Sequence, residues 1–316
     1  MKIVNASVSE IQEQDILKKI ELCGRICYKS EDKITENSCI DFVKMLIDRQ
    51  HLAMTEHAPL VLSVTQRMAA GIKRLGHGTF LNVTINTCDD RYIISGSVRA
   101  WYNLFTNKDA YDIQGEIISR CESYMQMSLG AELYSLLFPT RHRCADNKNY
   151  LLTQEEVLHL PNLNAEEAAA HLYLTAHFIC DRGVSHELVR HRPASFAQES
   201  TRYCNYARDI FGKEITVIDP EFIGNAKITW CNAMQEVEEA YFKLLDWGLT
   251  PQQARGVLPT DLKTEVVMTC NLGEWQHVIN LRYHGTTGAP HPHMLKVMSM
   301  WYDLVMAREG YNKWIK

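Results

Sequence analysis

The sequence predicts an α+β protein with a mixed or antiparallel sheet flanked by helices. Residues His171–Cys180 alternate strictly between apolar and polar side chains, as a strand with one buried face does. Residues Trp230–Leu244 instead place apolar side chains at helical spacing. Strands and helices intermix along the chain without a regular strand–helix–strand rhythm, and this favours α+β over a doubly wound sheet.

In the N-terminal half, short β-rich runs and amphipathic runs follow one another. We expect strands where apolar and polar residues alternate and helices where apolar residues recur every three or four positions. The expected strands are Met1–Val8, Pro59–Thr65, Phe80–Asn86 and Arg91–Ile94, with Cys88-Asp89-Asp90 as a turn. The expected helices are Ile11–Cys23, Asn37–Gln50 and Arg67–Leu75, and residues 97–166 are expected to be helical but irregular, broken by Pro139 and Pro161.

In the C-terminal half, residues that cap or break helices indicate where the elements begin and end. Ser185 can cap a helix that runs through Glu187 to Arg192, and Pro193 ends it. Gly248 is placed to stop the helix around Trp230–Leu244, and Thr250-Pro251 starts another that runs through Gly256. The last expected elements are a strand at Lys263–Cys270 and helices at Gly273–Tyr283 and His293–Arg308.

Composition limits the classes of partner. The chain has 316 residues and a formal net charge of -5, which argues against a general binder of nucleic acid or anionic membranes. No stretch approaches the ~20 apolar residues of a membrane span, and the N-terminus lacks an apolar run of signal-peptide length. Ten cysteines are scattered without a C-x-x-C pair, which indicates reduced thiols. We therefore expect a cytoplasmic protein.

One stretch concentrates positive charge. From Arg190 to Tyr203 three arginines and a histidine lie within an acidic protein, and Glu187 is an i,i+3 neighbour of Arg190. Arginine's planar fork suits a phosphate or the edge of a uracil, and the hydroxyls of Ser195, Ser200 and Thr201 could complete a nucleotide-phosphate cradle. From chemistry alone a salt-bridged or solvated structural cluster is equally open.

The same stretch resembles a known family. Arg190-His191-Arg192, followed after seven residues by Ser200, is similar to the RHR-x7-S signature of the flavin-dependent thymidylate synthases. Three further segments resemble that family in order, namely His51–His57, Pro251–Pro259 and Asn271–Arg282. A second triplet, Arg141-His142-Arg143, is followed eight residues later by Leu151 instead of serine, which indicates a surface loop. Four motifs in order are a specific signal, and they cover residues 1–66 and 170–308.

The resemblance implies a fold and an activity. It implies the flavin-dependent thymidylate synthase fold as one catalytic domain over residues 1–316, with a largely helical insertion at about 80–170 that is absent from shorter members. The implied enzyme is a methyltransferase that converts dUMP to dTMP with FAD, taking NADPH and 5,10-methylenetetrahydrofolate as co-substrates. A homotetramer with active sites between subunits is also implied.

Site residues follow by position from the same resemblance. Arg282 would be catalytic, because its permanent positive charge would stabilise the anion that develops on the uracil ring. The residues implied for dUMP are Glu187, Arg190, Gln198, Glu199, Ser200, Thr201, Arg202, Arg255 and Arg282. The residues implied for FAD are His51, Glu56, Arg190, His191, Arg192, Gln198, Asn271 and His277.

Some positions depart from the family pattern. Ala197-Gln198 replaces a common Asn-Glu, Ala53 replaces Ser or Thr, and the segment after Arg282 follows a His-Pro variant. Two alternatives therefore stay open: a pyrimidine-nucleotide hydroxymethylase on the same scaffold, and a non-enzymatic nucleotide- or RNA-binding protein.

Other chemistries have little support in the sequence. His284, His291 and His293 could suggest a metal, but Pro292 intervenes and no Cys/Asp/Glu set is near, so no metal is expected. No P-loop or Rossmann glycine motif occurs. No cysteine follows a proline, as the nucleophile of the other thymidylate synthase type usually does.

Overall fold

The computed structural model describes the chain from residue 1 to 315, except residues 85–91, 139–149, 161–162, 203 and 209–210. Within these residues the fold is α+β, as predicted, with two four-stranded antiparallel sheets and one pair of parallel strands. No helix among the described residues is long and apolar enough to cross a membrane. Turn Cys88-Asp89-Asp90, Pro139, Pro161 and the triplet at 141–143 lie outside the described residues.

The central sheet positions the site. Its strand order is β2 (Ser7–Glu10), β7 (Tyr173–Asp181), β10 (Lys263–Asn271) and β8 (Ser195–Gln198), all antiparallel. Leu172, Leu174, Ala176, Phe178 and Cys180 are all buried, which confirms the predicted alternation. The two faces of the sheet therefore meet different helical layers.

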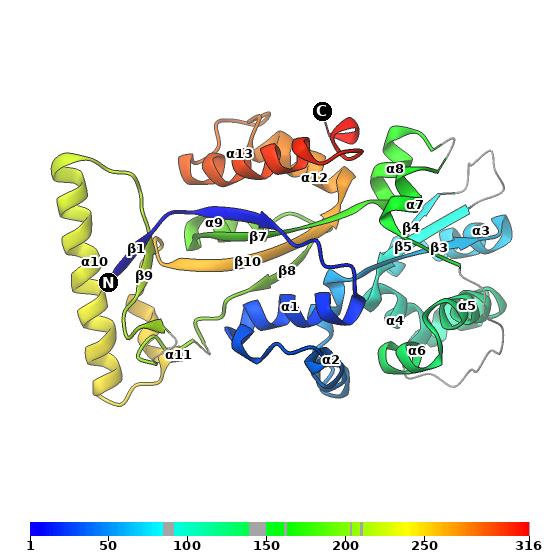
Figure 1. Cartoon of the computed structure of the whole chain (residues 1–316), viewed down its shortest axis with the longest axis horizontal. Coiled ribbons are helices and arrows are strands. Elements are labelled where there is room, and N and C mark those ends of the chain that lie inside the picture. Colours follow the sequence, from blue (N-terminus) through cyan, green and yellow to red (C-terminus); the bar gives the residue numbers. More distant parts are fainter. Residues whose placement is uncertain (85–91, 139–149, 161–162, 203, 209–210, 316) are drawn as a thin grey trace.

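One face of the central sheet carries α12 (Leu272–Arg282) and α13 (Pro292–Ala307), which lie above it in Figure 1. Trp275 and Trp301 are fully buried with ring centroids 4.7 Å apart, and Trp275 Nε1 donates to the Leu174 carbonyl at 3.1 Å. Burial of such side chains contributes about 1.5–3 kcal/mol each, so this layer anchors α12 firmly on the sheet.

The opposite face carries α1 (Ile16–Tyr28) and α2 (Ser38–Asp48), together with the short helix η2 (Leu52–His57). Ile20 and Cys23 of α1 share a core with Val267 of β10 and Ala197 of β8. The first helix begins later than its pattern predicted, because Asp15 accepts the backbone N–H of Lys18 and caps it.

The second sheet is built from both sides of the predicted insertion boundary. Its order is β4 (Asn82–Thr84), β5 (Tyr92–Ser97), β3 (Pro59–Val64) and β6 (Leu151–Leu152). Packed around or following it are α3 (Gln66–Arg74), α4 (Val98–Thr106), α5 (Lys108–Leu129), α6 (Ala131–Leu137), α7 (Gln154–Leu158) and α8 (Ala165–His171). The described residues of the segment 80–170 are mostly helical, as expected, and they also supply strands β4, β5 and β6.

A buried polar chain connects the two sheets. His171 accepts or donates hydrogen bonds at 2.7 Å to both Ser95 Oγ and Thr84 Oγ1. Ser95 Oγ also lies 3.3 Å from the Tyr173 hydroxyl, at the start of β7. Burial lowers the pKa of His171 to about 4, so its ring is neutral at physiological pH.

The remaining elements lie at the other end of the molecule. Strand β1 (Lys2–Val4) pairs in parallel with β9 (Thr216–Ile218), beside the long helix α10 (Gly224–Asp246) and α11 (Pro251–Ala254). The predicted single strand Met1–Val8 is therefore wrong: it is divided between β1 and β2, which belong to different sheets. Strand β9 was not predicted.

The helix before Arg190-His191-Arg192, the cationic motif, also differs from its prediction. Helix α9 spans Arg182–Leu188, and its cap is Asp181, whose Oδ1 accepts the Val184 N–H at 2.7 Å. Ser185 lies inside the helix and donates to the Arg182 carbonyl. Because Asp181 ends a long strand with a side-chain acceptor, the helix starts one turn earlier and ends before Arg190.

Candidate active site

The cationic motif lies between α9 and the edge of the central sheet. After α9 the chain turns through Arg190–Arg192 and then enters β8, where Ala197 pairs with Val267 of β10. Arg190 and Arg192 are exposed, whereas His191 is only 5% exposed. The two arginines can therefore reach a ligand, and the histidine between them belongs to the interior.

Arg282 lies at the last position of α12 and is held by residues of the motif region. Its Nη1 donates to Glu187 Oε2 at 2.6 Å, and its Nη2 donates to the Glu187 carbonyl at 3.4 Å. Its Nε donates to His191 Nε2 at 3.1 Å. The structure thus brings together three predicted site residues, although Arg282 lies 95 positions after Glu187 and 91 after His191 in the sequence.

This contact fixes the proton of His191. A guanidinium has no acceptor, so His191 Nε2 must offer its lone pair to Arg282, and the ring proton lies on Nδ1. Burial, and then the charges of Arg282 and the other nearby groups, lower the pKa of His191 to about 4. The ring is therefore neutral at physiological pH and presents one N–H donor on its far side.

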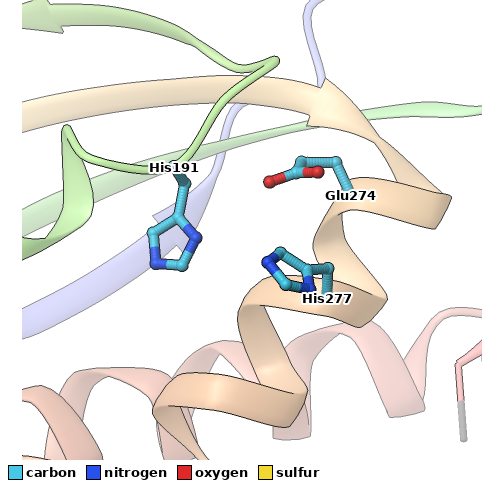
Figure 2. A group of neighbouring side chains, drawn as sticks. All are labelled: His191, Glu274 and His277. Atoms are coloured by element: carbon cyan, nitrogen blue, oxygen red, sulfur yellow. The ribbon is translucent and has the colours of Figure 1, made fainter.

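Figure 2 shows what this donor faces. One ring nitrogen of His191, one of His277 and the Glu274 carboxylate surround a common gap, and their potential ligand atoms lie within 4.8 Å of one another. Burial raises the pKa of the Glu274 carboxyl, whose Oε1 has no hydrogen-bond partner. Because His191 offers an N–H to this gap instead of a lone pair, the cluster suits a hydrogen-bonding ligand better than a metal ion.

A second group of predicted residues lies in the loop after β8. Arg202 Nε donates to Gln252 Oε1 at 3.2 Å, and its backbone N–H donates to Ser200 Oγ at 3.3 Å. Arg255 Nη1 donates to Thr201 Oγ1 at 3.4 Å. These contacts connect the loop to α11 and to the short helix Arg255–Val257 that follows it. Arg202 and Arg255 are both exposed. Two exposed cations beside two hydroxyls form a suitable anion site.

Gln198 and Glu199 lie in contacts within the protein. The Gln198 amide donates to Ser185 Oγ at 2.9 Å and to Thr264 Oγ1 at 3.3 Å. The Glu199 side chain is 2% exposed, and its Oε2 accepts from Lys263 Nζ at 3.0 Å. Alternation along the strand turns these two side chains toward opposite faces of the sheet. Ligand contacts by these side chains stay predictions.

The predicted flavin residues outside the motif are more dispersed. His51 is exposed just before η2, and Glu56 Oε1 accepts from Arg99 Nη1 at 2.5 Å. Asn271 caps α12, because its Oδ1 accepts the Glu274 N–H at 2.9 Å.

His57 is fully buried with Nδ1 2.8 Å from Thr269 Oγ1, and burial lowers its pKa to about 3. His57 is therefore a neutral core histidine.

Two of the three late histidines lie together, because the rings of His291 and His293 have centroids 5.1 Å apart. His293 Nδ1 lies 2.7 Å from Asp181 Oδ2, so it joins the start of α13 to the cap of α9. The ring of His284 instead lies against Tyr283 and Tyr302. Among the described residues, the metal-competent group is the one formed by His191, Glu274 and His277.

Sequence reasoning missed a group of buried charges beneath the motif. Lys263 and Glu265 project from β10 toward Lys29 at the end of α1, and His177 of β7 contacts the same carboxylate. Burial opposes ionisation of Glu265, but hydrogen bonds from His177, Lys263 and Lys29 outweigh it and hold the pKa of this carboxyl below its usual range. The signal was present, because charged residues at alternate positions of an apolar strand indicate a paired, inward-facing cluster.

The sequence of the site region matches a known protein family. A sequence model of the family described as thymidylate synthase complementing protein, Thy1, matches residues 135–300. The chain belongs to this family. The Thy1 region contains α9, the cationic motif, α11 and α12, and thus nearly all of the candidate site.

Several relatives of this Thy1 chain are curated proteins named flavin-dependent thymidylate synthase. The one from Thermococcus onnurineus is 36% identical over 133 residues, which are 40% of this chain and 53% of that protein. The one from Corynebacterium aurimucosum is 32% identical over 171 residues, or 48% and 64% of the two chains. The chain thus spans about half to two thirds of the length of these relatives.

Solved structures give a weaker likeness. A UMP/dUMP methylase, PolB from Streptomyces cacaoi, bound with 5-Br dUMP, is 13% identical to the Thy1 chain, with a TM-score of 0.40. That alignment covers 97% of this chain and 92% of the other.

Proposed function

We propose that the protein is a flavin-dependent thymidylate synthase, a methyltransferase that converts dUMP to dTMP. The observation that carries the proposal is the guanidinium of Arg282, held between Glu187 and His191 beside the cationic motif of a Thy1 chain. A fixed, permanently charged donor at this position can stabilise negative charge on a pyrimidine ring during attack from C5.

We further propose FAD as the cofactor, with NADPH and 5,10-methylenetetrahydrofolate as co-substrates. The residues proposed to hold FAD are His51, Glu56, Arg190, His191, Arg192, Gln198, Asn271 and His277. The gap in Figure 2 supports this assignment, because a neutral N–H donor and a carboxyl oxygen without a partner suit the mixed donors and acceptors of a flavin edge. When bound, FAD supplies the redox chemistry of the reaction.

The proposed dUMP site uses both groups of arginines. Arg190, Arg202 and Arg255, with the hydroxyls of Ser200 and Thr201, would neutralise the phosphate. Arg282 would meet the uracil edge, with Glu187 as its anchor, while Gln198 and the backbone of Glu199 would complete the pocket wall. The exposure of Arg190, Arg202 and Arg255 supports these roles, since a substrate can reach them.

The organisation of the enzyme is part of the proposal. We propose one catalytic domain over residues 1–316 with an insertion at about 80–170, working in the cytoplasm as a homotetramer whose sites lie between subunits. His51 supports the last point, because its exposed position just before η2 leaves it accessible to a second subunit.

Activity of the purified protein tests the proposal directly. We expect flavin absorbance and NADPH-dependent release of the C5 hydrogen of dUMP in the presence of 5,10-methylenetetrahydrofolate. Arg282→Ala is expected to abolish turnover while flavin stays bound, and Arg67→Ala, at an exposed arginine of α3, serves as the matched control with full activity. Full activity in Arg282→Ala would refute the assigned role.

Product analysis separates the proposal from its alternatives. With dUMP and dCMP offered separately, dTMP is the expected product. A hydroxymethylated nucleotide without dTMP would establish the hydroxymethylase instead. A colourless protein that binds RNA at moderate salt would establish the binding protein.

A further inference from the structure

A network of buried and partly buried charges lies at the start of the loop that follows β8. Lys263 Nζ contacts Glu199 Oε2 at 3.0 Å and also contacts Glu265 Oε1. Glu265 Oε1 accepts from Lys29 Nζ at 2.7 Å, and Glu265 Oε2 lies 2.9 Å from His177 Nε2. The network therefore connects the end of α1, the middle of the sheet and the start of the loop.

The burial of these charges calls for an explanation. Side-chain exposure is 2% for Glu199, 10% for Glu265, 16% for Lys263 and 18% for Lys29. Removing charges from water is costly, and well-packed apolar residues often replace buried ion pairs without loss of stability. Stability alone therefore does not explain the network, and a role in specifying one conformation is the better account.

Glu199 is the member of the network that controls the loop. Its backbone N–H donates to the Glu265 carbonyl at 2.9 Å, so it extends the β8–β10 pairing by one residue. Glu199 itself stands at the start of the loop, where its Oε2 accepts from Lys263 Nζ of β10. Its Oε1 accepts from the hydroxyl of Tyr206, which follows the loop, at 3.4 Å. One buried carboxylate thus connects both ends of the segment that carries Ser200 and Arg202.

A direct role of the Glu199 carboxylate in substrate binding is disfavoured. The carboxylate is buried, and both of its oxygens have partners within the protein. A negative charge would also repel a phosphate at short range. Its influence on an anionic ligand must therefore be exerted through the loop.

We propose that Glu199 and Lys263 are positioning residues, whose buried pair holds the Ser200–Arg202 loop in the conformation that receives the phosphate of a pyrimidine nucleoside monophosphate. This inference rests on the proposed function for the identity of the nucleotide. It assigns a role to Lys263, a partly buried charge at the start of an otherwise mostly apolar strand.

The test compares Glu199→Gln with Glu31→Gln in the flavin-loaded protein. Glu31 is a matched control, because it is 37% exposed and pairs with Lys29 of the same network instead of Lys263. For Glu199→Gln we expect KM and Kd for dUMP to rise roughly 10–100-fold, while kcat and flavin content stay within about twofold. The affinity for deoxyuridine, which lacks the phosphate, is expected to stay unchanged.

Lys263→Met and Tyr206→Phe extend the test. Lys263→Met is expected to reproduce the loss of dUMP affinity, and the double variant with Glu199→Gln to be no weaker than the worse single variant, because the two residues act as a pair. If Glu199→Gln fails to fold, Tyr206→Phe keeps every charge and removes one donor to Glu199. It is expected to raise KM for dUMP by roughly 2–10-fold.

Two outcomes would overturn the inference without touching the proposed function. One is wild-type affinity for dUMP in folded Glu199→Gln, and the other is an equal loss for dUMP and deoxyuridine. If the wild-type protein binds no dUMP, the proposed function fails instead. Amide hydrogen exchange at residues 199–202 then decides the positioning role, which requires faster exchange in Glu199→Gln than in Glu31→Gln.

Discussion

Arg282 is oriented by a single carboxylate, and Glu187→Gln tests how much that orientation matters. Glu187 Oε2 lies 2.6 Å from Arg282 Nη1, while the side chains are 32% and 21% exposed. Glutamine has the same length and can still accept one hydrogen bond at this position. The substitution therefore removes the charge of the anchor and leaves its shape.

The expected magnitude follows from the interaction that is lost. In Glu187→Gln the charged guanidinium still donates to the amide oxygen, so the loss is the Coulomb attraction of the ion pair, which contributes about 1 kcal/mol at partly exposed sites. Since about 1.4 kcal/mol corresponds to a factor of ten in rate, kcat should fall roughly fivefold if the orientation of Arg282 acts in the transition state. Glu187→Ala, which removes the acceptor altogether, should lower kcat further.

The assay is steady-state release of the C5 hydrogen of dUMP, with flavin content measured on the same preparation. Glu239→Gln is the control, because Glu239 also pairs with a cation but is 70% exposed, and such pairs contribute little. An unchanged kcat in Glu187→Gln would refute the reasoning. Equal losses in Glu187→Gln and Glu239→Gln would refute it as well.

Two further predictions concern stability. Burial lowers the pKa of His171 in the folded protein to about 4, whereas the same histidine in the unfolded chain has a pKa of about 6.5. Between these two values only the unfolded chain binds the proton, so the free energy of unfolding decreases as the pH falls from about 6.5 to about 4. Urea unfolding gives the free energy of unfolding at pH 7.5 and at pH 5, and the difference between the two should be about 2 kcal/mol smaller in His171→Gln than in the wild type. The exposed control His159→Gln should keep the wild-type difference. An equal difference in all three proteins would contradict this prediction. In Gly71→Ala the new Cβ would lie 2.2 Å from a side chain of α5, so the free energy of unfolding should fall by about 1–3 kcal/mol. In the control Gly78→Ala the new Cβ has no atom within 4 Å, and stability should not change. Equal stability of the two variants would show that α3 and α5 can move apart without cost.

Long periodic segments made much of the fold predictable. The alternation at 171–180 and the helical spacing at 230–244 correspond to β7 and α10. The strand buries the predicted face, whereas α10 buries Trp230, Met234 and Tyr241 and leaves Ala233 of the expected apolar face exposed. The division of Met1–Val8 between two sheets was not predictable in this way. A single apolar run does not reveal that Val4 and Ser7 have different partner strands, since those partners lie about 170 to 215 positions away.

The sequence proposed a set of site residues but not their contacts. The family resemblance assigned Arg282 and His191 to one site, and the structure shows them 3.1 Å apart. The motif spacing could not show that Glu199 faces Lys263, because side-chain direction depends on where β8 begins and pairs. The contact of Arg282 with Glu187 likewise arises from two helix ends that meet only in the tertiary structure.

The second sheet makes the segment 80–170 hard to remove. Both neighbours of β3, namely β5 and β6, come from that segment, so an excised chain would leave β3 with two bare edges of unpaired backbone groups. Such edges recruit other strands, and a shortened form would therefore tend to aggregate. A lineage that acquired this segment would be committed to keeping it, whatever its original advantage, unless substitutions elsewhere first covered β3.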